Sequence, residues 1–404
     1  MDLAQARALD AADPLAAMRE RFALPAGVIY LDGNSLGALP RATPAALADA
    51  AGRQWGERLI RSWNEGWIDA PRRLGAKIAP LIGAAADEVI VGDSTSANLY
   101  KLIVAALRLD PTRTEVVSEA GNFPTDLHIA EGAVACVPSG TLHIVPRADL
   151  AGAIGKRTAL LLLTHVHYKT AERFDMVALT HAAHDAGALV LWDLSHSVGA
   201  VPIDLDGCDA DLAVGCGYKY LNGGPGAPAF LYVARRWQER LANPLSGWMG
   251  HAAPFAFEDG YRPAPGMTRW LSGTPAILGL AALETALDLW SDVDRAALWA
   301  KSAALFAILA AAGDAAGLPC VSPRDPAHRG SHISFRHPDA YALTQALIAR
   351  GVIGDFRDPD ILRLGLTPLY LSHEDVWRAG ETLREVIATE VWRDPAFAER
   401  RPVT

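Results

Sequence analysis

The sequence predicts an α/β fold with a mostly parallel sheet, helices on both faces and a smaller α+β domain. In the first two-thirds of the chain, short uninterrupted apolar runs alternate with segments of helical spacing, as expected for parallel strands buried on both faces. Several of these runs end in polar residues, which is typical of a sheet edge that meets a ligand. From about residue 276 the chain turns into long alanine- and leucine-rich helices with few strands.

The length and composition favour a large domain with a smaller one attached. The chain has 404 residues, half of them hydrophobic, which is enough for an extensive buried core. We expect an N-terminal segment (residues 1–50) that packs with the small domain, a large ligand-binding domain (51–284) and a small C-terminal domain (285–404).

Charge and hydropathy indicate a soluble protein with a small-molecule ligand. The net charge of −9 and the pI near 5.7 argue against a nucleic acid or an anionic membrane as partner. Apolar runs such as residues 159–163 fall far short of the ~20 residues that cross a bilayer. The N-terminus has no signal-peptide pattern, and four cysteines without CxxC spacing favour a reducing, cytoplasmic setting.

Short strands and helices alternate along the first half of the chain. Residues 28–31 predict a first strand, followed by the turn-like loop 32–37. Residues 88–92 and 115–118 predict further strands, separated by a helix over residues 99–109. Between them, the polar stretch DSTSAN precedes the helix, where hydroxyls and free N–H groups make either a plain helix cap or an anion site.

The alternation continues to the middle of the chain. Residues 158–163 predict a buried strand, 176–186 a helix, and 188–192, 211–217 and 229–233 three more strands.

The end of the chain predicts the small domain. Strands are expected at residues 331–335 and 361–365, with a helix over 340–350 between them and a final amphipathic helix. Arg363 lies inside the second of these apolar strands, where an unpaired guanidinium would be very costly. It forms either a buried ion pair with Asp355 or Asp358, or a two-pronged contact with a ligand carboxylate.

Asp193 and Lys219 follow two of the buried runs. Lys219 lies between two tyrosines at the start of a glycine-rich loop, and the carboxyl ends of parallel strands meet at one edge of a sheet. An amine that has lost its proton can form an imine with an aldehyde, and a carboxylate can keep a pyridine nitrogen protonated. The pair therefore indicates pyridoxal 5'-phosphate (PLP). The alternatives are a structural lysine and an aspartate that caps the next helix.

Other sequence patterns do not indicate a site. His165 and His167 resemble a metal-binding pair, but no third ligand has suitable spacing, so we expect no metal. The glycines around Cys216 lack the third glycine of a dinucleotide-binding motif, and neither GxxxxGK[ST] nor GxSxG occurs.

Seven segments, taken in order, resemble kynureninases, which are fold-type-I PLP enzymes related to class V aminotransferases. The resemblance runs from about Tyr30 to Tyr370, and WDLSH with YKYLNGGPG is shared in looser form by cysteine desulfurases. The segments are LDGNSLG (31–37), NFPTD (122–126), LTHVHYKT (163–170), WDLSHSVGAVP (192–202), GCGYKYLNGGPG (215–226), PLSGWMGH (244–251) and RLGLTPLY (363–370).

The resemblance implies a PLP-dependent hydrolase that cleaves a carbon–carbon bond, converting L-kynurenine to anthranilate and L-alanine in tryptophan catabolism and NAD biosynthesis. By the same resemblance, Lys219 carries the cofactor and removes the substrate's α-proton, while Asp193 keeps the ring protonated. Tyr218 donates a proton to the product and contacts the phosphate. His196 orients Asp193 or the ring hydroxyl, or else only supports the site from behind.

The resemblance also implies the remaining contacts to the cofactor and the substrate. The cofactor contacts are phosphate donors, a ring that stacks on the pyridine, an aspartate near it, and two residues contributed to the neighbouring subunit of a homodimer: Thr95 and Ser96, Phe123, Asp126, and Trp248 and Thr274. Arg363, Trp63 and Asn34 are expected to contact the substrate. The sequence does not decide between kynurenine and its 3-hydroxylated form, because the side-chain geometry at Trp63, Gly273 and Thr274 sets that choice.

Three rival functions are possible. A cysteine desulfurase or selenocysteine lyase needs a mobile reactive cysteine, but only Cys320 comes late enough, and its surroundings LPCV look buried. An ordinary transaminase fits the motifs less well. A non-catalytic PLP-binding regulator is disfavoured because no DNA-binding module is visible and the net charge is negative.

Overall fold

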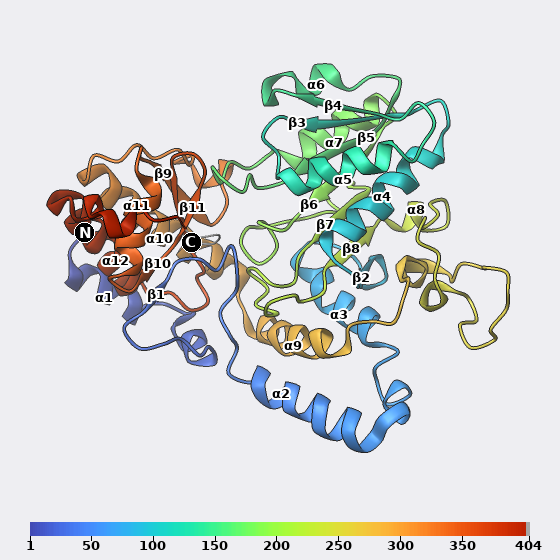
Figure 1. Cartoon of the computed structure of the whole chain (residues 1–404), viewed down its shortest axis with the longest axis horizontal. Helices are drawn as coiled ribbons and strands as arrows, with labels where there is room; N and C mark the ends of the chain where they lie inside the picture. The colour runs from blue at the N-terminus through green and yellow to red at the C-terminus, as the bar shows by residue number, and fades with distance from the viewer. Residues whose placement is uncertain (401–404) are drawn as a thin grey trace.

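The computed structural model of the chain describes residues 1–400 as a large domain beside a small one (Figure 1). The large domain is built on a seven-stranded sheet with the order β2-β8-β7-β6-β5-β3-β4. Neighbours from β4 to β7 are parallel, and β8 runs antiparallel to both β7 and β2. The strands are β2 (Val89–Val91), β3 (Glu115–Glu119), β4 (Thr141–Val145), β5 (Thr158–Thr164), β6 (Leu189–Asp193), β7 (Leu212–Gly215) and β8 (Phe230–Val233).

Helices cover both faces of this sheet, because alternate strand residues point to opposite sides. Residues such as Leu160 and Leu162 pack on one side with α4 (Thr95–Leu109) and α5 (Pro124–Val134). Leu161 and Leu163 pack on the other side in a second hydrophobic cluster. That cluster includes side chains of α3 (Ala70–Ile78), α7 (Met176–Asp185) and α9 (Ile277–Asp288). The predicted α/β class, with a mostly parallel sheet, is confirmed.

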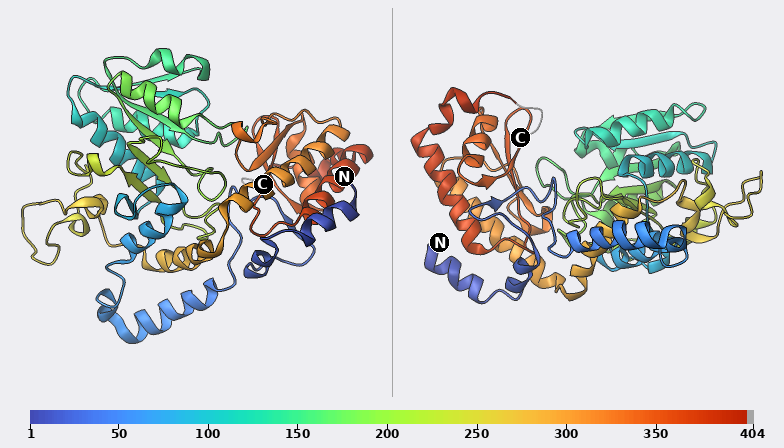
Figure 2. Two further views of the ribbon diagram at one scale, coloured as in Figure 1. Left: turned by 180° about the vertical axis from the view of Figure 1, so that it is seen from behind. Right: turned by 60° about the horizontal axis from the view of Figure 1, so that its bottom comes forward.

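The small domain combines the C-terminal third of the chain with its N-terminus, as Figures 1 and 2 both show. Its antiparallel sheet has the order β11-β12-β9, and α1 packs on α12 while β1 pairs in parallel with β10. The predicted domain boundaries themselves stay a prediction. The elements are α1 (Leu3–Ala11), β1 (Ile29–Tyr30), α10 (Arg295–Ala315), β9 (His332–Arg336), α11 (Ala340–Ile348), β10 (Val352–Ile353), β11 (Asp355–Arg357), β12 (Ile361–Gly365) and α12 (His373–Thr389).

The hydropathy of helix α10 is higher than expected, because the sequence predicted no apolar segment long enough to cross a bilayer. Among residues 1–400, one helix is long and apolar enough to cross a membrane, judged by length and composition alone, and it is the 21-residue α10. The helix packs on α12 and β9, and half of its most apolar window is buried in the protein. Its apolar character is therefore accounted for by the core of the small domain.

Some strands and helix ends differ from the sequence prediction. The strand expected over 211–217 spans only β7, and the helix expected from residue 99 begins at Thr95. Strand β4 was not predicted, because it forms the edge of the sheet and lacks a continuous buried run.

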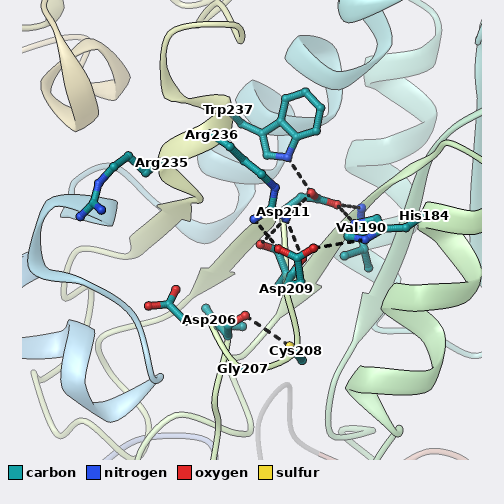
Figure 3. Close-up of polar contacts among 12 residues, drawn as sticks. His184, Val190, Asp206, Gly207, Cys208, Asp209, Asp211, Arg235, Arg236 and Trp237 are labelled. Carbon is teal, nitrogen blue, oxygen red and sulfur yellow. Dashed lines mark hydrogen bonds and ion pairs between the residues drawn. The ribbon is translucent and has the colours of Figure 1, made fainter.

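A buried carboxylate, Asp211, ties the amino edge of the sheet together (Figure 3). Its two oxygens accept hydrogen bonds from the Val190 N–H (2.9 Å), His184 Nε2 (2.9 Å), Arg236 Nη2 (2.8 Å) and Trp237 Nε1 (2.6 Å). These donors come from β6, α7 and the short helix α8 (Arg235–Gln238). The contacts fix the sheet at the edge opposite to the one where the predicted site residues lie.

Replacing Asp211 with Asn should lower the free energy of unfolding by roughly 3 kcal/mol. The amide NH2 group of Asn would face N–H donors that now bind a carboxylate oxygen, and it would leave the Arg236 charge without a full partner. Urea denaturation measures the change. Asp209→Asn is the matched control, since Asp209 is exposed on the same loop and its ion pair with Arg236 should contribute less than about 1 kcal/mol. Equal effects of the two substitutions would contradict the assignment.

Candidate active site

Lys219 lies at the carboxyl edge of the large sheet, in the loop after β7. The side chain is buried, and its Nζ is 3.0 Å from His196 Nε2. The Nζ also lies 5.7 Å from the centre of the Phe123 ring and 5.8 Å from that of Tyr218. His196 follows β6 and Phe123 follows β3, so parallel strands far apart in sequence bring these side chains together.

Two carboxylates, Asp193 and Asp126, form the back of this cluster. Asp193 ends β6 and accepts a hydrogen bond from the Ser195 N–H (2.6 Å), while Asp126 lies in the first turn of α5 and accepts one from Thr164 Oγ1 (3.1 Å). Burial and the neighbouring Asp193 carboxylate raise the pKa of Asp126 well above its usual range. Asp126 therefore holds its proton to a higher pH than an exposed aspartate does.

His196 is uncharged in this setting. Burial lowers the pKa of His196 well below its usual value, and the positive charge of Lys219 lowers it further. Because an ammonium group only donates, Nε2 accepts from Lys219 and Nδ1 carries the proton. Within residues 1–400 this Nδ1 is buried and has no hydrogen-bond partner. His196 thus contacts Lys219, and its remaining donor is available to a ligand.

The start of α4 lies beside Tyr218. Ser94 caps the helix by accepting from the Ala97 N–H (3.2 Å), so Thr95 and Ser96 are its first two residues. Backbone N–H groups at this position have no partner within the helix and favour an anion. A cavity of about 290 Å³ opens here, lined by residues that include Ser94, Thr95, Tyr218, Gly273 and Thr274.

Arg363 forms the buried ion pair with Asp355 that the sequence left open. Its Nε donates to Asp355 Oδ1 (2.7 Å) and its Nη2 to the other carboxylate oxygen, while Ser35 Oγ and the Tyr168 carbonyl also accept from it. Burial would raise the pKa of Asp355, but the guanidinium outweighs this effect and lowers it to about 2. Asp355 is one of the two ion-pair partners that the sequence offered as alternatives to a ligand carboxylate, whereas Ser35 was not singled out.

The N-terminal loop of residues 32–37 holds the two domains' site residues in place. Asn34 is fully buried and accepts from Arg363 Nε (2.9 Å), and the Gly37 N–H donates to the Tyr218 carbonyl (2.7 Å). A Cβ at Gly37 would lie 2.3 Å from the Lys219 carbonyl oxygen, so only glycine fits there. Asn34 positions Arg363 and does not face open space.

Two predicted site residues lie apart from Lys219 within one chain. Trp63 packs edge-to-face on Trp67, with ring centres 5.6 Å apart. Trp248 is 39% exposed and packs edge-to-face on Phe255. The structure does not bring either tryptophan to the Lys219 cluster of the same chain.

The two histidines of the rejected metal pair have separate packing roles. His165 packs edge-to-face on Trp192, and burial lowers its pKa to about 3. His167 Nε2 lies 2.8 Å from the Gly121 carbonyl.

Comparison with known proteins decides the family. Residues 298–383 match the model of the kynureninase C-terminal domain. A kynureninase from Burkholderia mallei is 53% identical over 411 residues, which covers 99% of both chains. The chain belongs to the kynureninase family. A kynureninase from Deinococcus radiodurans is also similar, with 51% identity over 94% of this chain and 95% of its own.

Solved structures share the fold of this kynureninase-family chain at lower identity. A cysteine desulfurase from Thermococcus onnurineus has a TM-score of 0.78 and 18% identity, covering 93% of this chain and 98% of its own. A C-DES variant with glycine covalently linked to its PLP cofactor has a TM-score of 0.77 and 18% identity, covering 90% of this chain and 98% of its own. These neighbours support fold type I.

The residues of this kynureninase-family chain fit PLP. Lys219 offers the amine, the Phe123 ring a stacking surface, and the Asp193 carboxylate a partner for a protonated pyridine nitrogen. The unpartnered His196 Nδ1 offers a donor. The cavity at the start of α4 suits a phosphate.

Lys219→Ala should abolish the visible absorbance band that PLP gives when bound covalently, because no other amine lies in this cluster. Absorbance after gel filtration of the PLP-loaded chain measures it, and circular dichroism verifies the fold. Lys156→Ala, in an exposed loop, should keep the band. A Lys219→Ala variant that kept it would remove Lys219 from the site.

Proposed function

We propose that this chain hydrolyses L-kynurenine to anthranilate and L-alanine with PLP held by Lys219. The full-length identity of 53% to a kynureninase carries this proposal, and the buried Lys219 cluster supports it. When bound, PLP supplies an electron-accepting ring that stabilises negative charge at the substrate's α-carbon. The remaining steps belong to the chain's own side chains.

Lys219 moves protons in this scheme. The Lys219 Nζ would remove the substrate's α-proton, and neutral His196 keeps the Nζ in place by accepting its hydrogen bond. The Asp193 carboxylate, at the end of β6, would pair with the protonated pyridine nitrogen and stabilise its positive charge. Proton transfer by Lys219 requires an uncharged imidazole beside it, and burial of His196 supplies one.

Tyr218 is the proton donor at the end of the reaction. Water adds to the γ-carbonyl, the Cβ–Cγ bond breaks so that Cγ leaves as the carboxylate of anthranilate, and Cβ takes a proton to become the methyl group of alanine. Burial raises the pKa of Tyr218, so its phenol is protonated at neutral pH and can donate. Its ring lies beside Lys219, which places both proton carriers on the same side of the site.

A cysteine desulfurase activity is less well supported. Cys320, the cysteine considered for this activity, is half-buried, and its backbone pairs with that of Phe335 in an isolated β-bridge. Its Sγ donates to the Ser322 carbonyl (3.5 Å). Burial raises its pKa, which disfavours the reactive thiolate. The desulfurases similar in structure share the fold alone.

Anthranilate fluorescence should rise when L-kynurenine is added to the PLP-loaded chain, and L-cysteine with excess dithiothreitol, which reduces a persulfide to sulfide, should release no sulfide. Prior thiol alkylation should leave the rate unchanged, because no cysteine takes part in the scheme. A comparison of kcat/KM for kynurenine and 3-hydroxykynurenine establishes the preferred substrate. Release of sulfide from L-cysteine, with no anthranilate from kynurenine, would reject this proposal and indicate a cysteine desulfurase.

We also propose a cytoplasmic homodimer that acts in tryptophan catabolism and feeds NAD biosynthesis. The segment between α8 and α9 extends from the body of the chain (Figures 1 and 2) and exposes Trp248, Phe255 and Phe257 by 39%, 59% and 80%. Exposed apolar side chains in one segment favour a second copy as partner. The four cysteines are free, which supports a reducing compartment.

A mixture of Lys219→Ala and Trp248→Ala chains tests whether Trp248 acts on the neighbouring subunit's site. If it does, each heterodimer contains one intact site, with lysine from one chain and tryptophan from the other. Subunit exchange between the two weakly active variants should then restore up to half of the wild-type specific activity per heterodimer. Absence of any recovery, with exchange verified by native mass spectrometry, would assign Trp248 to its own chain.

A further inference from the structure

His332 lies on the face of the small-domain sheet that carries Arg363. It begins β9 and pairs with Gly365 on β12, two residues after Arg363, so the two side chains point to the same side. The His332 ring is 5.8 Å from that of His196, which in turn contacts Lys219. His332 therefore lies between the lysine cluster of the large domain and the guanidinium of the small one.

The imidazole of His332 has no partner within residues 1–400. The residue is fully buried, and neither ring nitrogen makes a hydrogen bond. Burial lowers its pKa well below the usual value, and the charge of Arg363 lowers it further, so the ring is neutral and has one N–H donor. An unpaired buried polar group is costly, which indicates that a ligand satisfies it.

Arg363 has too few free donors to hold a carboxylate alone. A guanidinium has five N–H groups. Nε and Nη2 use three of them on Asp355 and Ser35, with Asn34 sharing the Nε–H, and Nη1 uses one on the Tyr168 carbonyl. A single N–H on Nη1 remains, whereas a bound carboxylate presents two oxygen atoms.

We propose that His332 is a substrate-binding residue, which donates its N–H to the α-carboxylate of the bound amino acid beside Arg363. The inference rests on the proposed function only in that the ligand is an α-amino acid. One carboxylate oxygen takes the remaining Nη1–H of Arg363, and the other takes the N–H of His332. A neutral donor suits this position, because a second cation would repel the nearby Lys219 and Arg363.

L-alanine and L-alaninamide distinguish this role, because they differ only in the carboxylate. Their dissociation constants for the PLP-loaded full chain are measured from the change in visible absorbance. His332→Phe should reduce the preference for L-alanine about tenfold, through weaker binding of L-alanine alone. His332→Gln, whose amide can donate, should stay within about threefold of wild type. His337→Phe, at a half-exposed position just after β9, is the matched control and should change neither constant.

Thermal unfolding separates this role from a structural one. His332→Phe should keep or raise Tm, because it removes buried polar atoms that have no partner. An unchanged preference for L-alanine, or an equal loss for both ligands, overturns the inference. A chain that shows the predicted preference but produces no anthranilate from kynurenine keeps this inference and rejects the proposed function.

Discussion

The parallel register of β5, β6 and β7 is the constraint on which the site depends. Thr164 pairs with Asp193 and Asp193 pairs with Val214, so the three strands end at one level. A slip of one residue would turn every side chain to the opposite face, placing Asp193 away from Asp126 and burying its charge among apolar helices. The continuous burial of both faces makes such a slip too costly to occur.

The small domain is positioned by the same core. One hydrophobic cluster continues from the large sheet through Leu287 and Trp290 into the small domain, where it includes Leu305 and Phe335. The two domains therefore meet through packed side chains. This contact explains how Arg363 and His332, from a separate sheet, come to face the lysine cluster.

Three buried cations of this protein each form an ion pair with an aspartate. Arg363 pairs with Asp355, Lys101 with Asp93, and Lys301 with Asp13, each cation being almost fully buried. Such pairs contribute modest stability but hold a loop or strand in one geometry. Buried polar atoms without a partner occur at several places in residues 1–400, and those of His196 and His332 lie next to Lys219 and its neighbour. These are the unpaired groups that a ligand at Lys219 can reach.

Local sequence patterns were enough to predict the sheet, its helical cover and the position of Lys219 and Asp193 at one edge of it. Uninterrupted apolar runs indicate parallel strands, and parallel strands share a carboxyl edge. The resemblance to kynureninases added Phe123 and Asp126, which lie in the cluster. Contacts across domains were beyond such patterns. The partner of Arg363 depended on the register of the β11–β12 hairpin, which pairs it with Asp355. His332 has no feature in the sequence that distinguishes it from an ordinary strand residue. The contacts of Trp63 and Trp248 depend on which surfaces face each other in the folded chain. Periodicity reports which way a side chain points, whereas only the packed chain decides what it meets.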